Sequence, residues 1–401
     1  MPLLRSRMRR GAGPVLARTD ATVVFDAGHD GSWSIGIRGG EIAARPGRVR
    51  RPTTTVSAPL DVLRDVIGGR RAGSEAFLSG ELTVRGNLAI ALQLDGVFDD
   101  RGLPDGHPRA RMCLAAGIRT AYLEAGPRDA PPVVLVHGLG ATNASFLPTL
   151  IELSQNYRVI APDLPGHGAS EAVRDSYHAT FLGRWLVGFL DRLQLDAPVL
   201  VGNSLGGRIA LEAAFSAPDR VSGLGLLAPA VSFRKWRQFV PLVRALDPRL
   251  ARLPIPINRR IATHELRRMF SDPRVLPRSW YDSAIDESLR VLAIHSSRVA
   301  FFSALREVYL DEPFGERGFW DRLKGLDTPA LFIWGEHDRL VPARFAPHVK
   351  AAVPAARSVV LERCGHVPQF EQPERTHALL REFLVSVGSM PAGQQQQEVS
   401  V

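Results

Sequence analysis

"PVLVGNSLGGRIALEAA", residues 198–214, is the stretch of sequence that decides the fold of this chain. It opens with the end of an apolar run, which is typical of a buried strand, and it closes with the residue spacing of a helix. Ser204 stands between the two, with glycines two residues before and two residues after it. Glycine leaves room for a chain that turns sharply from strand to helix. The pattern predicts a strained turn that lifts Ser204 above a sheet, and such strain is mostly kept at functional sites.

Apolar segments that read as strands alternate with helical segments along residues 112–387. The expected strands lie in CLAAGIRTAYLEAG (a hairpin), PPVVLVHGLG, YRVIAPDLPGHGAS, PVLVGNS, VSGLGLLAPA, PALFIWGEHD and SVVLERCGHV. Strands rich in Val, Leu and Ile that alternate with helices predict a mainly parallel sheet covered on both faces. The chemistry of such sheets gathers at the carboxyl ends of their strands, where Ser204, Asp338 and His366 all fall.

Five segments resemble those of the serine α/β-hydrolase superfamily, in their order along the chain as well as in their residues, and the resemblance covers residues 112–387. They are GNSLG at 202–206, HGLG at 137–140, DLPGHGAS at 163–170, WGEHDRLVP at 334–342 and CGHVPQFEQPE at 364–374. The order Ser, Asp, His along the chain is also that of the family. The resemblance implies a mainly parallel α/β-hydrolase sheet with a helical cap at about residues 231–322.

The candidate catalytic residues each have a chemical role. The Ser204 hydroxyl is a poor nucleophile until a base removes its proton, and His366 is the expected base. Asp338 is expected to hold the other imidazole nitrogen and to stabilise the imidazolium. The backbone N–H groups of Leu139 and Leu205 are expected to bind the oxyanion, toward which the helix after Ser204 also points its positive end. We expect neither a metal ion nor a cofactor.

Other titratable residues near these motifs are weaker candidates. His337 is adjacent to the expected acid, but neighbouring residues at a strand end usually point apart. His137 and His167 lie in glycine turns, where a structural role is expected. Asp163 precedes the serine, whereas the family places its acid after it, and Glu336 is the nearest substitute for that acid. A serine nucleophile also counts against the dehalogenase and epoxide-hydrolase branches of the family.

The expected cap carries two amphipathic segments, RQFVPLVRALDPRLARL and SLRVLAIHSSRVAFFSAL. Its aromatic residues have two interpretations. One is packing of the cap helices, and the other is an apolar pocket for the acyl or alcohol part of a substrate. The aromatic residues concerned are Phe233, Trp236, Phe239, Phe301 and Phe302.

Residues 18–100 form a different, smaller unit. Three short strands are expected first, followed by a helix with Ser57 as its cap and Gly68–Gly69 as its stop. The segment AFLSGELTVRGNLAIAL then reads as a strand and a helix that is apolar on several sides. This unit resembles the sterol-carrier-protein type 2 family, which implies a small α/β fold with an apolar lipid tunnel. The alternative is a docking or dimerisation module without a ligand.

Composition and charge limit the partners and the location that this chain can be expected to have. The 401 residues carry a net charge of +9, but no lysine-rich run, zinc spacing or aromatic RNA-binding signature, so nucleic acid is not an expected partner. No apolar run approaches the roughly 20 residues of a membrane span. We expect residues 1–17 to be a disordered leader of a cytoplasmic protein, with peripheral contact to an anionic membrane as the alternative. Residues 101–111 are an expected linker, and 388–401 an expected disordered tail.

These features predict a serine hydrolase that acts on small-molecule carboxylic esters, with a lipid-binding domain that raises the local substrate concentration near Ser204. The same triad would also serve a carbon–carbon bond hydrolase of the ring-cleavage type, or a cofactor-free haloperoxidase or perhydrolase. A lipid carrier whose hydrolase portion is a non-catalytic scaffold is a further alternative.

Overall fold

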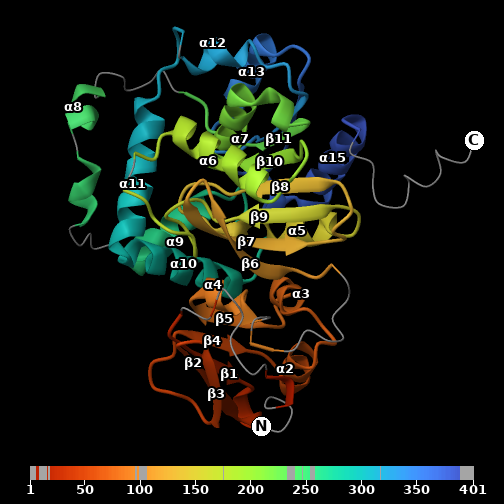
Figure 1. Cartoon of the computed structure of the whole chain (residues 1–401), viewed down its shortest axis with the longest axis vertical. Coiled ribbons are helices and arrows are strands. Elements are labelled where there is room, and N and C mark those ends of the chain that lie inside the picture. The colour runs from red at the N-terminus through yellow and green to blue at the C-terminus, as the bar shows by residue number, and fades with distance from the viewer. Residues whose placement is uncertain are drawn as a thin grey trace, which may run out of the picture.

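The computed structural model contains two β-sheets, a small one built by the first strands and a larger one in the body of the molecule (Figure 1). Most of the predicted leader, residues 101–105 of the predicted linker and nearly all of the predicted tail lie outside the described residues, as do Phe233, Trp236 and Phe239. The described residues are 6–8, 16, 19–94, 97–98, 106–174, 176–232, 240–245, 247–252, 258–316 and 318–388.

The small sheet has five strands in the order β3-β2-β1-β4-β5. Only the β1–β4 pair is parallel, and its three other pairs are antiparallel. Leu16 of the predicted leader is fully buried in the core of this unit, and Met8 forms a β-bridge with Phe98. The strands are Ala21–Asp26, Ser32–Arg38, Glu41–Pro46, Thr54–Ser57 and Thr83–Gly86, and the helices are α2 (Leu60–Ile67), α3 (Gly73–Leu78) and α4 (Leu88–Ala91).

Local structure in this unit differs from the sequence prediction at three places. Ser57 does not cap a helix, because its backbone continues the parallel pairing of β4 with Asp26, and Pro59 stands at the N-cap of α2. The segment AFLSGELTVRGNLAIAL, residues 76–92, is expected to begin with a strand, but its first three residues belong to helix α3. The expected apolar helix is the single turn α4, which Asn87 caps by accepting a hydrogen bond from the Ile90 N–H at 3.1 Å.

The large sheet has eight strands in the order β13-β12-β11-β10-β8-β9-β7-β6. The hairpin β6–β7 and the β7–β9 pair are antiparallel, and all other pairs are parallel. This confirms the predicted, mainly parallel α/β sheet. In chain order the strands are Arg109–Ala115, Ile118–Ala125, Pro132–Val136, Arg158–Pro162, Val199–Asn203, Gly223–Leu227, Ala330–Gly335 and Arg357–Leu361.

Helices cover both faces of the large sheet because alternate strand residues point to opposite sides. Val133 and Leu135 of β8 belong to the core that contains α5 (Leu147–Leu153) and α15 (Pro373–Ser386). Val134 and Val136 belong instead to the core that contains α6 (Ala179–Arg192), α7 (Leu205–Ser216) and α13 (Ala346–Ala352). The short helix α14 (Pro368–Glu371) precedes α15. The strands are therefore apolar on both faces.

Between β11 and β12 the chain forms the helices expected for a cap. The amphipathic segment at 288–305 is not continuous, because Ile294 takes an extended conformation between α10 and α11. In Figure 1 the helices α9 and α10 lie to the left of strands β7 and β6 and above α4 and β5, and α10 contacts both β5 and α4. The bounds are α8 (Val240–Ala245), α9 (Arg259–Arg268), α10 (Arg278–Ala293), α11 (His295–Leu310) and α12 (Phe319–Leu323).

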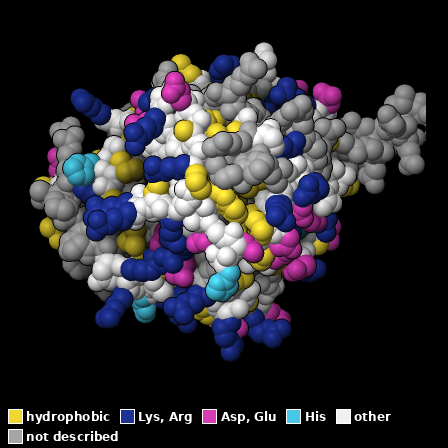
Figure 2. Space-filling model, turned by 90° about the horizontal axis from the view of Figure 1, so that it is seen from below, with side chains coloured by type: hydrophobic (Ala, Val, Ile, Leu, Met, Phe, Trp, Pro, Cys, Tyr) yellow, Lys and Arg dark blue, Asp and Glu magenta, His cyan; other side chains and the backbone are white. Residues whose placement is uncertain are grey.

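The surface at the N-terminal end carries many basic side chains with acidic ones between them (Figure 2). Several of these arginines form ion pairs, such as Arg70 with Asp65 and Arg48 with Asp26. Among the described residues, none of the helices has the length and apolar character needed to cross a membrane.

A buried ion network fastens α7 to α12 and to the end of α11. Glu212 is fully buried and accepts hydrogen bonds from Arg208 at 2.9 Å and from Arg322 at 2.7 Å, while Arg208 also pairs with Asp311 at 2.7 Å. Removing one member of a buried network leaves the other charges uncompensated. The network therefore couples the helix that follows Ser204 to the cap.

We predict that Glu212→Ala lowers the free energy of unfolding by about 3–5 kcal/mol, because Arg208 and Arg322 then lose a buried partner. Urea unfolding followed by circular dichroism measures the change. Glu382→Ala is the control, since the Glu382–Arg357 pair is exposed and removal of such a pair changes stability by about 1 kcal/mol or less. Equal effects in the two variants would contradict the prediction.

Candidate active site

The strained turn predicted at Ser204 is present. Ser204 has φ 55° and ψ −119°, between the last residue of β10 and the first of α7. A Cβ on Gly206 would lie 1.9 Å from the Val136 carbonyl oxygen, and a Cβ on Gly202 would lie 2.5 Å from the Gly206 backbone. Real side chains do not approach backbone so closely. The two glycines are therefore required for the turn that raises Ser204 above the sheet.

His366 and Asp338 form a buried hydrogen-bonded pair, with 2.7 Å between His366 Nδ1 and Asp338 Oδ2. Their side chains are 5% and 0% exposed. The other Asp338 oxygen accepts hydrogen bonds from the backbone N–H groups of Leu340 at 2.7 Å and Val341 at 2.9 Å. Because the carboxylate is an acceptor on both sides, it favours the imidazole tautomer with the proton on Nδ1. His366 Nε2 is then available as a base.

Hydrogen bonds connect the serine turn to the loop that carries His366. The Asn203 side-chain amide donates to the carbonyl oxygens of Leu227 and His366, both at 3.0 Å. The His366 N–H donates in turn to the Met269 carbonyl at 2.6 Å. Ser204 and His366 line the same cavity. The structure thus brings Ser204, Asp338 and His366 together from the ends of three strands.

The loop after β8 passes directly over Ser204. A Cβ on Gly138 would lie 3.2 Å from the Ser204 Cβ, and Leu139 lines the cavity beside it. Leu205 is the first residue of α7, so its N–H belongs to the helix end that has no internal partner. The two expected oxyanion donors therefore lie on the two segments that flank the serine.

His137 holds this loop in place and does not face the cavity. Its Nδ1 donates to the Gly138 carbonyl at 2.8 Å, and its Nε2 accepts from the Leu164 N–H at 2.9 Å. The neutral imidazole is required for this pair of bonds. Burial lowers the pKa of His137 to about 3, and the neighbouring His167 contributes in the same direction. The expected structural role of His137 agrees with these contacts.

The other alternative residues have partners of their own. His337 is half-exposed and its Nδ1 lies 2.6 Å from the Ser271 hydroxyl. Glu336 accepts from the Arg363 N–H at 2.9 Å. Asp163 accepts from two backbone N–H groups, and burial raises its pKa to about 7. Among the hydrogen bonds of the described residues, none of these three is joined to His366.

The cavity at Ser204 has a volume of about 330 Å³ and a mostly apolar wall. The cap contributes Phe301, which agrees with the pocket interpretation of the cap aromatics for this one residue, and the cap and the histidine loop add three aromatic residues that the sequence analysis did not identify. Two further lining residues, Phe77 and Leu88, come from the small N-terminal unit. No sequence pattern points to them, because their position depends on how two units dock. The three additional aromatic residues are Phe270, Trp280 and Phe370.

Within the part of the chain that the structure describes, no three His, Cys, Asp or Glu side chains are grouped so as to hold a metal ion. The expectation of a metal-free and cofactor-free site stays a prediction.

Comparison with known proteins supports both sequence resemblances. The family model of the α/β hydrolase fold matches residues 131–373, and that of the SCP-2 sterol transfer family matches residues 3–99. A 2-hydroxymuconate semialdehyde hydrolase from Pseudomonas sp. strain CF600 is 32% identical over 68% of this chain and 93% of its own. A 2-hydroxy-6-oxo-2,4-heptadienoate hydrolase from Pseudomonas putida is 30% identical over 69% of this chain and 96% of its own.

A solved structure also shares the fold. The crystal structure of a membrane phospholipase A, described as a bacterial virulence factor, superposes with a TM-score of 0.60. It is 24% identical and covers 82% of this chain and 97% of that one.

The contacts of His137 predict a loss of stability in mild acid. The unfolded chain takes up a proton at this residue near pH 6.5, whereas the folded chain does so only near pH 3. Stability that is present above pH 6.5 is therefore lost as the pH falls through this window, at about 1.4 kcal/mol per pH unit. Between pH 6.5 and pH 5 we expect a loss of about 2 kcal/mol from His137.

Urea unfolding at a series of pH values measures this loss. The His137→Gln variant should have a shallower pH dependence, because glutamine does not titrate. The slope is reduced rather than abolished, since burial also lowers the pKa values of His167 and His377. An unchanged slope in the variant would contradict the assignment.

Proposed function

This chain belongs to the α/β-hydrolase family, and we propose that it hydrolyses carboxylic esters of apolar, lipid-like acids through a triad of Ser204, His366 and Asp338. The observation that carries the proposal is that His366, which forms a buried 2.7 Å pair with Asp338, lines the same apolar cavity as the strained Ser204. A nucleophile beside a base that a third group orients is the arrangement that activates a serine.

The proposed reaction has two steps. The Ser204 Oγ attacks the ester carbonyl carbon while His366 Nε2 takes its proton, and the N–H groups of Leu139 and Leu205 bind the oxyanion. The tetrahedral intermediate then expels the alcohol, which receives the proton from His366, and leaves an acyl-serine. Water attacks this acyl group with the same base, so the acid is released and Ser204 is restored.

The lining of the cavity supports a neutral, apolar substrate. Among the described residues that line it, none is a lysine or an arginine. The carboxylate it contains, Glu287, is paired with Arg290 at 2.5 Å and accepts from the Leu88 N–H at 3.1 Å. An uncharged acyl chain fits this wall better than an anionic substrate does, because a buried charge needs a partner.

The second candidate function is carbon–carbon bond hydrolysis, and the identity with the two Pseudomonas hydrolases favours it. The muconate and heptadienoate in their names are carboxylates. A cation would be expected in a cavity that receives such a substrate, and the described lining residues include no lysine or arginine. Ester hydrolysis therefore remains the function that the site supports best.

We predict that Ser204→Ala lowers turnover by about 10⁴- to 10⁶-fold while the protein stays folded. A panel of neutral esters and a carboxylate ring-cleavage product measures turnover, and a fluorophosphonate probe measures labelling. Ser216→Ala is the control, because Ser216 lies at the far end of α7. Labelling of the Ser204→Ala protein equal to that of the parent would refute the nucleophile. A parent that cleaves only the carboxylate substrate would favour the second candidate.

We predict that the base is His366 and not His337. His366→Ala should remove ester hydrolysis, because the group proposed to accept the serine proton is then lost. His337→Ala should retain most of it, since the half-exposed His337 side chain contacts Ser271 and Glu336. Steady-state kinetics of both variants decide the matter. The opposite ranking of the two would assign the role of base to His337.

A further inference from the structure

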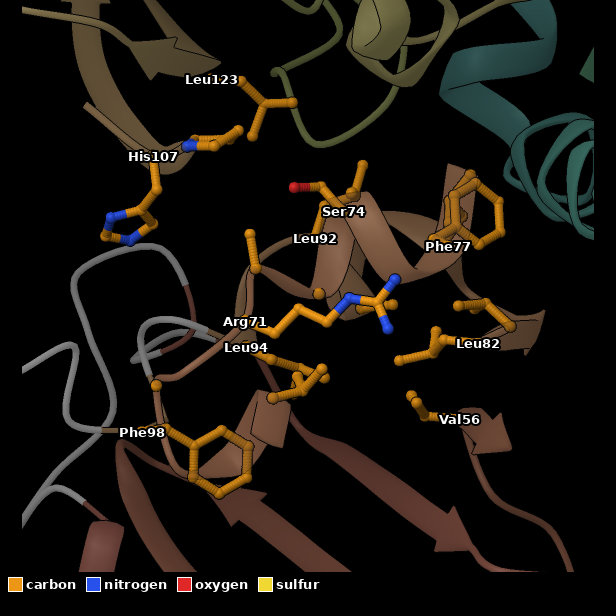
Figure 3. A pocket seen from close by; sticks show the side chains of 18 of the residues that line it. Val56, Arg71, Ser74, Phe77, Leu82, Leu92, Leu94, Phe98, His107 and Leu123 are labelled. Carbon is orange, nitrogen blue, oxygen red and sulfur yellow. The ribbon is translucent and has the colours of Figure 1, made fainter. Parts of the chain in front are cut away.

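A second apolar cavity, of about 110 Å³, lies in the small N-terminal unit, and Leu123 of β7 also lines it. In Figure 3, Val56, Leu82, Leu92 and Phe98 surround this space, and Phe77 stands on the side nearest the cap helices. Arg71 also lines the cavity, but its guanidinium is paired with Glu81 at 2.7 and 2.8 Å. The wall therefore offers a ligand mainly apolar surface.

This cavity and the cavity at Ser204 share two wall residues. Phe77 of α3 and Leu88 of α4 line both spaces. Their side chains are 7% and 6% exposed, so the partition between the cavities is buried. The two cavities therefore adjoin each other at these two residues.

Polar contacts from α10 fix this partition relative to the active site. Asp286 accepts from the Gly86 N–H at 3.0 Å and from Arg85 Nε at 2.7 Å. Glu287 accepts from the Leu88 N–H at 3.1 Å. The Ser283 hydroxyl donates to the Val84 carbonyl at 2.5 Å. Because these bonds hold the backbone of β5 and α4, Leu88 is anchored, whereas Phe77 belongs to the separate six-residue helix α3.

We propose that the acyl chain of an ester bound at Ser204 extends past Phe77 and Leu88 into the N-terminal cavity. The small unit then forms the distal part of the acyl site, and Phe77 determines the chain length that the enzyme accepts. This inference rests on the proposed ester hydrolysis. Rotation of the Phe77 ring joins the two spaces, since Leu88 is held through its backbone.

The size of the N-terminal cavity sets the expected effect. A chain carbon is about the size of a water molecule, which occupies about 30 Å³. A cavity of 110 Å³ therefore holds roughly three to four chain carbons. Burial of each methylene strengthens binding by about fourfold. Loss of this cavity should therefore reduce kcat/KM for a long-chain ester by more than tenfold.

The first test fills the cavity in the full-length protein. Ala91 lines the N-terminal cavity but not the one at Ser204, so Ala91→Phe should occupy the space. We expect the ratio of kcat/KM for a sixteen-carbon ester to that for a four-carbon ester to fall by more than tenfold. Ala43→Phe is the matched control, because Ala43 is exposed on β3 and lines neither cavity. An unchanged ratio in folded Ala91→Phe would overturn the inference.

The second test removes the partition and keeps the inference falsifiable if Ala91→Phe does not fold. Phe77→Ala should raise the same ratio, and the double variant Phe77→Ala/Ala91→Phe should lose that gain. Ile35→Ala controls for lost core packing, since Ile35 is fully buried in the same unit and lines neither cavity. A ratio that Phe77→Ala leaves unchanged, or a gain that survives in the double variant, would overturn the inference alone. A parent that hydrolyses neither ester would instead refute the proposed function on which it rests.

Discussion

The conformation of Ser204 is the constraint on which the candidate active site depends. A non-glycine residue with φ of 55° and ψ of −119° is strained, at a cost of about 1–3 kcal/mol. The surroundings impose it, because every residue of β10 is buried and α7 begins at the next position. A Cβ at Gly206 would collide with the Val136 carbonyl, so α7 packs against β8 only with glycine there. The strain is therefore balanced by the packing of the sheet, and it places the hydroxyl in the cavity.

The docking of the small unit on α10 is a second constraint, because it makes the small unit part of the wall of the Ser204 cavity. The sequence predicts that the small unit is a lipid-binding domain that raises the local substrate concentration near Ser204. The structure adds a shared wall, because Phe77 and Leu88 line the Ser204 cavity. Three side chains of one cap helix, those of Ser283, Asp286 and Glu287, bond the backbone of β5 and the start of α4. Such bonds to backbone fix a register that apolar contact alone would leave free to slide.

The sequence predicted the large sheet and the residues at its edge because both depend on local pattern. The apolar runs and the glycines around Ser204 each act within a few residues, and the order of strands placed Asp338 and His366 beside it. The small unit was predicted less well. Ser57 has the composition of a helix cap, but its pairing with Asp26 in the sheet overrides that preference. The sequence placed Leu88 in an apolar helix but did not place Leu88 or Phe77 at the Ser204 cavity, since that position depends on contacts between the units, such as the bond from the Leu88 N–H to Glu287, 199 positions away.

A cavity with walls from two units links ligand binding to their docking. A ligand that touches Phe77 gains that contact only while β5 and α4 are seated on α10, so it stabilises the docked arrangement by the same free energy. Glu287 takes part in both ligand binding and docking, because it lines the cavity and accepts a hydrogen bond from the Leu88 N–H, and it also pairs with Arg290. The pair with Arg290 lies within α10, whereas the hydrogen bond from the Leu88 N–H exists only when the small unit is docked. The docked state is therefore the state in which the cavity has its complete apolar wall and Glu287 has both of its partners.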